Sequence, residues 1–215
     1  RIWLPFTRNN DDVLVTFSDD DGKTWARPRK ITDSVKQSNW GWYATGPGVG
    51  IQLSRGEFKG RLVIPCDHRI DTDAKRVTYS HVIYSDDHGK RWKLGGTVDR
   101  HTNECQVVEL HDGTLMMNMR NYWGRDGKDA ERDKRRAVAF SRDGGETWSD
   151  LRFDNTLIEP ICQASLVRIA TSQKEDQLLF SNPASKTTRH RLTVRLSNDG
   201  GKTWPQALLL HEGPS

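Results

Sequence analysis

The chain has 215 residues, which is enough for one ordinary domain or for part of a larger one. Only 34% of the residues are hydrophobic, but eight Trp, six Phe and four Tyr are spread along the chain, which argues against disorder. The net charge of +4 comes from interspersed basic and acidic residues rather than from a basic stripe, so we expect no nucleic-acid binding. No apolar window approaches the length of a membrane span.

The cysteines and histidines give no sign of a metal or cofactor. Cys66, Cys105 and Cys162 lack metal-ligand spacing, and the seven histidines form no ligand cluster, so we expect none. The sequence starts at Arg1 without a signal-like segment, and the compartment cannot be read from it.

Alternating apolar and polar residues predict short strands along the whole chain, and helical periodicity is absent. In chain order, strands are expected at 1–7, 13–17, 49–53, 61–65, 77–84, 106–110, 114–120, 136–140, 165–169, 177–181 and 192–196. A further short strand follows each copy of the repeat described next.

An eight-residue pattern, S-x-D-x-G-x-T-W, recurs four times, with Arg91 in place of Thr once. The copies lie at 18–25, 85–92, 141–148 and 197–204, and their starts are 67, 56 and 56 residues apart. Its Asp accepts hydrogen bonds from turn N–H groups, its Gly supplies a positive φ, and its Trp packs under the turn. The pattern therefore predicts a tight hairpin turn.

Each repeat unit contains four antiparallel strands in about 55 residues, and the turn joins the third strand to the fourth. This organisation predicts an all-β fold, a β-propeller with about four blades over residues 1–215 as one domain. Residues 1–7 match the second strand of a blade, so we expect a partial domain that is incomplete at both ends.

The boxes and the segments between them resemble those of bacterial-type exo-sialidases. The similar segments are 42–48, 103–110, 112–121, 181–184 and 192–197, and the boxes match the Asp boxes of that superfamily. The resemblance covers essentially the whole chain. It implies a six-bladed propeller that releases terminal sialic acid from glycoproteins, glycolipids or oligosaccharides. Secreted, periplasmic and lysosomal locations are all compatible with that family, so the compartment stays open.

The resemblance also implies a catalytic set of which this chain carries only part. In the family three arginines hold the substrate carboxylate, a Tyr attacks the anomeric carbon, a Glu activates the Tyr, and an Asp is the acid/base. The Tyr is expected just beyond Ser215, and the Asp and first arginine lie upstream. We therefore expect the 215 residues alone to be inactive.

Glu104 is the residue that the resemblance assigns as general base. Alignment of two blades through Cys105 and Cys162 places Glu104 opposite Ile161, on an inner strand where a carboxylate is costly unless it is used. The alternative is an exposed glutamate at a strand end.

Arg120 and Arg189 are the expected carboxylate-binding residues, because a planar guanidinium matches a carboxylate with two hydrogen bonds. A hairpin returns Arg120 to the rim that holds Glu104. Arg189 precedes the third strand of the last blade, but Arg191 points the same way in a strand and competes with it. We prefer Arg189.

Trp42, Tyr43 and His68 are candidates for the wall of the sugar pocket, and they fit packing roles equally well. The aspartates of the boxes look catalytic because they recur, yet their place in turns at blade edges predicts a structural role. Two other readings stay open for the whole chain: a non-catalytic propeller that binds glycans or proteins, and a trans-sialidase.

Overall fold

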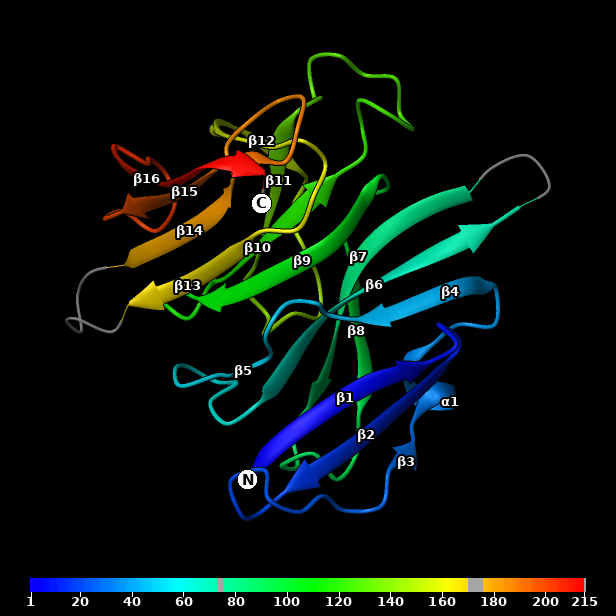
Figure 1. Ribbon diagram of the computed structural model, residues 1–215. Coiled ribbons are helices and arrows are strands. Elements are labelled where there is room, and N and C mark those ends of the chain that lie inside the picture. The colour runs from blue at the N-terminus through cyan, green and yellow to red at the C-terminus, as the bar shows by residue number, and fades with distance from the viewer. Residues whose placement is uncertain (73–75, 170–175, 215) are drawn as a thin grey trace.

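The computed structural model describes residues 1–72, 76–169 and 176–214, and nearly all of its regular structure is β-strand. The strands form four antiparallel sheets that follow one another in chain order and stand side by side as blades (Figure 1). Each sheet contains one box. This arrangement confirms the all-β propeller predicted from the repeat.

The four sheets have these strands. The first has the order β1-β2-β3, with β1 at Ile2–Arg8, β2 at Asp12–Ser18 and β3 at Arg29–Lys30. The second has the order β4-β6-β7-β8, with β4 at Trp40–Thr45, β6 at Leu62–Asp71, β7 at Arg76–Ser85 and β8 at Lys93–Thr97, while β5 at Ile51–Gln52 also pairs with β6. The third has the order β12-β11-β10-β9, with β9 at Thr102–Glu109, β10 at Leu115–Asn121, β11 at Arg135–Ser141 and β12 at Arg152–Ile158. The fourth has the order β13-β14-β15-β16, with β13 at Ser165–Ile169, β14 at Gln177–Pro183, β15 at His190–Ser197 and β16 at Gln206–Pro214.

The box turns are closed by the hydrogen bonds that their residue types predict. In the box at 141–148, the Ser141 hydroxyl donates to Asp143 at 2.8 Å and accepts the N–H of Gly145 at 2.9 Å. Asp143 also accepts the N–H of Thr147 at 2.9 Å, and Gly145 has a φ of 95°. The box carboxylates are therefore occupied within their own turns, in agreement with a structural role.

Two of the four box tryptophans also join neighbouring sheets, which the sequence pattern does not show. The indole of Trp148 donates to the carbonyl of Gly96 in β8 at 3.1 Å, and that of Trp204 donates to Asp154 in β12 at 3.0 Å. Both acceptors lie in the sheet before the one that carries the Trp. Each ring thus stabilises the packing between two blades as well as a turn.

The inner strand of the second sheet differs from its prediction. Only residues 51–52 of the expected strand 49–53 are paired, as β5, and the larger inner strand is β4, which precedes it. The segment 46–50 separates the two pieces and contains Gly46, with a φ of 90°, and Pro47, which has no N–H to give to a sheet. A four-residue helix, α1 (Thr32–Val35), is too short to leave a helical period in the sequence.

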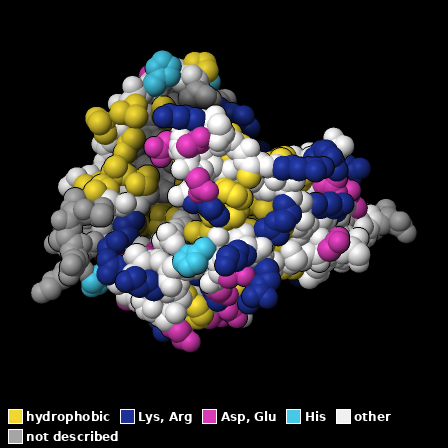
Figure 2. Space-filling view, turned by 90° about the horizontal axis from the view of Figure 1, so that it is seen from below, with side chains coloured by type: hydrophobic (Ala, Val, Ile, Leu, Met, Phe, Trp, Pro, Cys, Tyr) yellow, Lys and Arg dark blue, Asp and Glu magenta, His cyan; other side chains and the backbone are white. Residues whose placement is uncertain are grey.

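Three apolar clusters lie between successive sheets and form the core. The third sheet is covered on both faces, so β9 and β10 are buried almost throughout instead of alternating. On the face seen from below, basic and acidic side chains lie next to each other (Figure 2). Within the described ranges, no helix has the length and apolarity to cross a bilayer.

Candidate active site

Glu104 and Arg120 meet because β9 and β10 form a hairpin. Their register shifts between Met119 and Asn121, so a bulge falls at Arg120 and re-aims its side chain. The Nη1 group of Arg120 donates to the Oε2 atom of Glu104 at 2.7 Å, and the two side chains are 17% and 27% exposed. The pair is thus partly buried and still open to a ligand.

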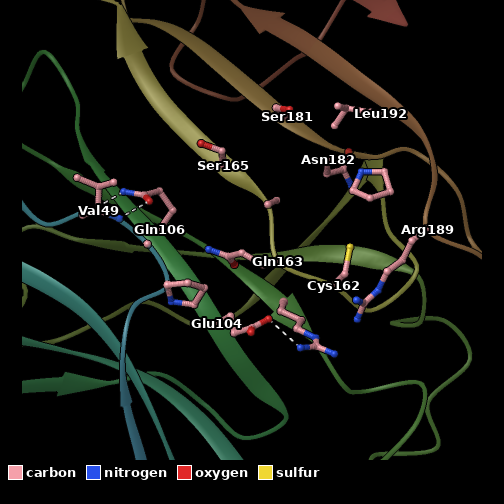
Figure 3. Close-up of a pocket in the computed structure, with 15 residues that line it drawn as sticks. Val49, Glu104, Gln106, Cys162, Gln163, Ser165, Ser181, Asn182, Arg189 and Leu192 are labelled. Carbon is pink, nitrogen blue, oxygen red and sulfur yellow. Dashed lines mark hydrogen bonds and ion pairs between the residues drawn. The ribbon is translucent and has the colours of Figure 1, made fainter. Parts of the chain in front are cut away.

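Glu104, Arg120 and Arg189 line one cavity of about 580 Å³. The second sheet contributes Pro47, Gly48 and Val49 to the lining, and the third sheet contributes Glu104, Gln106 and Arg120. The remaining lining residues come from the segment that links the third and fourth sheets and from the fourth sheet: Cys162, Gln163, Ala164, Ser165, Ser181, Asn182, Pro183, Arg189 and Leu192. Figure 3 shows Glu104 and Arg189 reaching this space from different elements. A cavity of this size fits a monosaccharide with polar substituents.

The side chains of Arg189 and Arg191 lie in different surroundings. Arg189 lines the cavity, whereas Arg191 does not and instead pairs with Glu212 at 2.5 Å. Arg191 has a φ of 63°, in the left-handed region, so the strand alternation that would aim positions 189 and 191 alike is broken between them. Only Arg189 is therefore placed with Glu104 and Arg120.

The wall between the second and third sheets is fixed by Gln106. Its side-chain amide accepts the N–H of Val49 and donates to the carbonyl of Val49, both at 2.8 Å. A Cβ on Gly48 would lie 2.2 Å from the carbonyl oxygen of Cys105, so only glycine permits this approach of the two blades. The wall is consequently rigid on this side.

A buried polar layer lies behind Glu104. Asp67 is fully buried, and the side-chain amide of Asn103 donates to it, while the hydroxyl of Tyr122 donates to Asn103 at 3.1 Å. Burial, and then the charge of Glu104, raise the pKa of Asp67 well above its usual value, with Arg120 opposing. A second negative charge next to Glu104 is therefore disfavoured.

A second arginine–glutamate pair, Arg136 with Glu159, supports the far wall. The two side chains are 0% exposed and 2.5 Å apart, and Arg136 also donates to the carbonyl of Cys162 at 2.7 Å. Burial raises the pKa of Glu159, with Arg136 opposing this effect. The pair holds the segment that contributes Cys162 and Gln163 to the cavity.

The three candidates for the sugar pocket do not line this cavity. Tyr43 and His68 are buried in the second sheet, where Trp40 stacks on His68 with a ring separation of 3.5 Å. His68 Nδ1 lies 3.0 Å from Nδ1 of His81. Trp42 is half-buried on β4. The structure thus gives Tyr43 and His68 packing surroundings.

Several polar neighbours of the cavity escape sequence reasoning. Asp67 carries a usable signal, since it follows the apolar run 62–66 and a carboxylate there is costly unless it has a purpose. Arg136 and Glu159 carry none, because they are distant in sequence. Among the described residues, no group of three or more His, Cys, Asp or Glu is arranged to hold a metal ion.

Box-containing blades around a cavity with one carboxylate and two guanidinium groups define a sialidase-type propeller. The BNR repeat-like domain family matches residues 5–215. A sialidase of Bacteroides fragilis (strain YCH46) is 39% identical over 207 residues, which are 94% of this chain and 35% of that protein. The chain belongs to the BNR-repeat family, among the bacterial-type sialidases.

Solved structures of sialidases have the same fold. The Hadza microbial sialidase Hz136 superposes with a TM-score of 0.80 at 39% identity, covering 94% of this chain and 37% of that one. A leech intramolecular trans-sialidase, solved with 2,7-anhydro-Neu5Ac, gives a TM-score of 0.74 at 25% identity, covering 94% and 30%. The chain thus spans well under half of the length of these relatives.

Proposed function

We propose that this chain forms part of an exo-α-sialidase that releases terminal sialic acid from glycoproteins, glycolipids or oligosaccharides. The observation that carries the proposal is the convergence of Glu104, Arg120 and Arg189 on one cavity from three separate elements. The similarity to sialidases over 94% of the chain supports it.

Arg120 and Arg189 bind the sugar carboxylate. Sialic acid differs from most sugars in carrying a carboxylate on its anomeric carbon, so a guanidinium pair fixes the position of the reacting centre as well as the charge. Among the described residues, the one side-chain hydrogen bond found for Arg120 runs from its Nη1 group to Glu104. Its outer N–H groups therefore remain available for the substrate.

Glu104 is the general base for a tyrosine nucleophile. The expected Tyr follows Ser215, which lies outside the described residues. Glu104 takes the phenolic proton, the phenolate oxygen attacks the anomeric carbon, and the acid/base Asp expected upstream gives its proton to the leaving sugar as the glycosidic bond breaks. Water then cleaves the sialyl–tyrosine bond, so the anomeric configuration is retained. A nucleophile that is neutral before attack suits this substrate, because a second carboxylate would repel the one on the sugar.

Arg120 also balances the negative charge of Glu104. The two side chains form a close ion pair, and the pair as a whole carries no net charge to repel the substrate.

An intramolecular trans-sialidase is the second candidate, since a relative of that name shares the fold at 25% identity. Such an enzyme would form 2,7-anhydro sugar in place of free sialic acid. Product analysis by NMR separates the two activities.

The test compares Glu104→Gln with the wild type in the full-length protein, on a fluorogenic sialoside. Loss of a general base lowers kcat by about two to four orders of magnitude, and substrate affinity changes little because the carboxylate contacts remain. The matched control is Glu109→Gln, on the same strand, because the Glu109 carboxylate accepts the N–H of Ser54 and lies outside the cavity lining. Equal turnover by Glu104→Gln and wild type rejects the assignment. The isolated residues 1–215 should show no turnover.

A further inference from the structure

A second cavity, of about 620 Å³, lies where three connections meet. It is lined at the start of β7 by Arg76 and Val77, between β8 and β9 by Arg100 and His101, and after β10 by Trp123 and residues 125–128. The segment after β10 stands above the sheets in Figure 1. None of these residues belongs to the lining of the cavity that holds Glu104.

The charge of the second cavity favours an anion. Its lining carries four basic side chains, Arg76, Arg100, Arg125 and Lys128, against one acidic side chain, Asp126. Asp126 pairs with Arg125 at 2.7 Å, and Arg100 lies 3.8 Å from Asp99 with both side chains more than half exposed. Exposed pairs of this kind are weak, so the cavity keeps an excess of positive charge.

The floor of the cavity is aromatic and closely built. The Trp123 and His101 rings meet edge to face with centroids 4.8 Å apart. A Cβ on Gly127 would lie 2.6 Å from the Trp123 ring and 3.2 Å from the His101 ring, so the loop packs directly on both. The loop is also bound to the residues that follow β10, because Asp126 N–H donates to the carbonyl of Tyr122 at 2.7 Å. An aromatic surface beside basic groups suits the binding of an acidic sugar.

Tyr122 connects the two cavities. The guanidinium carbon of Arg120 lies 4.9 Å from the centre of the Tyr122 ring, and that of Arg125 lies 3.9 Å from it. Arg120 lines the first cavity and Arg125 the second. The distance between the guanidinium carbons of Arg120 and Arg125 is thus at most the sum of their distances to the Tyr122 ring. Two neighbouring sugar units of one glycan can span that distance.

From this juxtaposition we propose that the second cavity binds an anionic group on the leaving part of the substrate. The ligand chemistry is a carboxylate or a sulfate carried by the sugar next to the terminal sialic acid. The inference rests on the proposed sialidase function and adds a preference for acidic over neutral leaving groups.

The test uses three substrates with the same terminal sialic acid, linked to galactose, to sulfated galactose or to a second sialic acid. The variant is Arg76→Gln with Arg100→Gln, which changes two exposed residues of the second cavity and leaves Arg125 and Tyr122 in place. The matched control is Arg142→Gln, an exposed arginine in a box turn. kcat/KM is measured for each in the full-length protein.

The wild type is expected to prefer one or both acidic substrates, and the double variant to lose about three- to tenfold in kcat/KM on them. Neutral substrate and the Arg142→Gln control should be unaffected. If kcat/KM exceeds that of the neutral substrate only for the sulfated substrate, or only for the one with a second sialic acid, the result identifies which anionic group the cavity binds. Wild type that cleaves all three equally, or a variant that loses equally on all three, overturns the inference and leaves the sialidase function standing. No release of sialic acid from any of them by wild type overturns both.

Discussion

Two arginine–glutamate pairs of the third blade share their chemistry and differ in their surroundings. Arg136 and Glu159 are fully buried, and Arg136 also bonds Asn118 and the carbonyl of Cys162. Arg120 and Glu104 are partly exposed at the cavity. The buried pair is committed to protein groups, whereas the open pair keeps hydrogen-bonding capacity for a ligand.

Burial therefore separates a structural ion pair from a candidate catalytic one, even though the residue types are the same. A buried pair is costly to break because the remaining charge has no water, and an open pair can exchange its partner for a substrate. The comparison predicts that changes in the first pair affect folding and changes in the second affect chemistry.

The largest effect on stability is expected from breaking the buried pair. Arg136→Met leaves the Glu159 carboxylate buried without its partner, and the free energy of unfolding should fall by about 3–5 kcal/mol. Urea unfolding measures this. The double variant Arg136→Met with Glu159→Leu should recover most of the loss, and a double variant as unstable as the single one contradicts this explanation.

A smaller effect on stability, of about 2–3 kcal/mol, is expected from the buried side chain of His68 when the pH falls from about 7.5 to 4.5. Burial lowers the pKa of His68 to about 3, so the folded protein binds fewer protons there than the unfolded chain. Its contribution to stability is complete above the unfolded pKa of about 6.5, and it declines by about 1.4 kcal/mol for each pH unit below that, down to the folded pKa.

Urea unfolding of wild type and His68→Gln from about pH 7.5 to 4.5 isolates this contribution. The variant should lose stability less steeply as the pH falls. Parallel curves for the two proteins would show that His68 does not titrate differently in the folded state.

The smallest effect is expected from the most exposed pair. Arg191 and Glu212 are 51% and 65% exposed, so Arg191→Ala should change the free energy of unfolding by less than about 1 kcal/mol. Activity on a sialoside should stay at the wild-type level. A large loss of activity would mean that Arg191, and not Arg189, holds the substrate.

The repeated parts of this molecule are well predicted from the sequence. Box residues such as Ser141, Asp143 and Gly145 act within eight positions of one another, so their spacing alone specifies the turn. The hairpin that brings Arg120 back to Glu104 is local too. The strand expected at 114–120 lies within one residue of β10, but β9 begins at Thr102, before the expected 106–110, and so includes Glu104.

Contacts between blades are less accessible from the sequence. The bonds from Gln106 to Val49 and from Arg136 to Cys162 join residues far apart in the chain, and no local pattern announces them. For Tyr43 and His68 the sequence suggests a site that the structure does not show, since both side chains are buried in the second sheet. An aromatic residue in or near a segment that resembles a sialidase fits a sugar pocket and a core equally well. The choice between Arg189 and Arg191 depends on one left-handed residue that alternation cannot predict.

The proposed function depends above all on joint recognition of a sugar carboxylate by Arg120 and Arg189 beside Glu104. The dissociation constant of a non-hydrolysed sialic acid analogue tests this, together with that of the same sugar with its carboxylate reduced to an alcohol. Both ligands are measured with wild type, Arg120→Lys, Arg189→Lys and the control Arg191→Lys. We predict that each of the first two variants binds the acid about 1.5–3 kcal/mol more weakly, with little change for the alcohol and none for the control. Equal affinity of the wild type for acid and alcohol, or normal binding of the acid by Arg120→Lys and Arg189→Lys, would contradict the assignment.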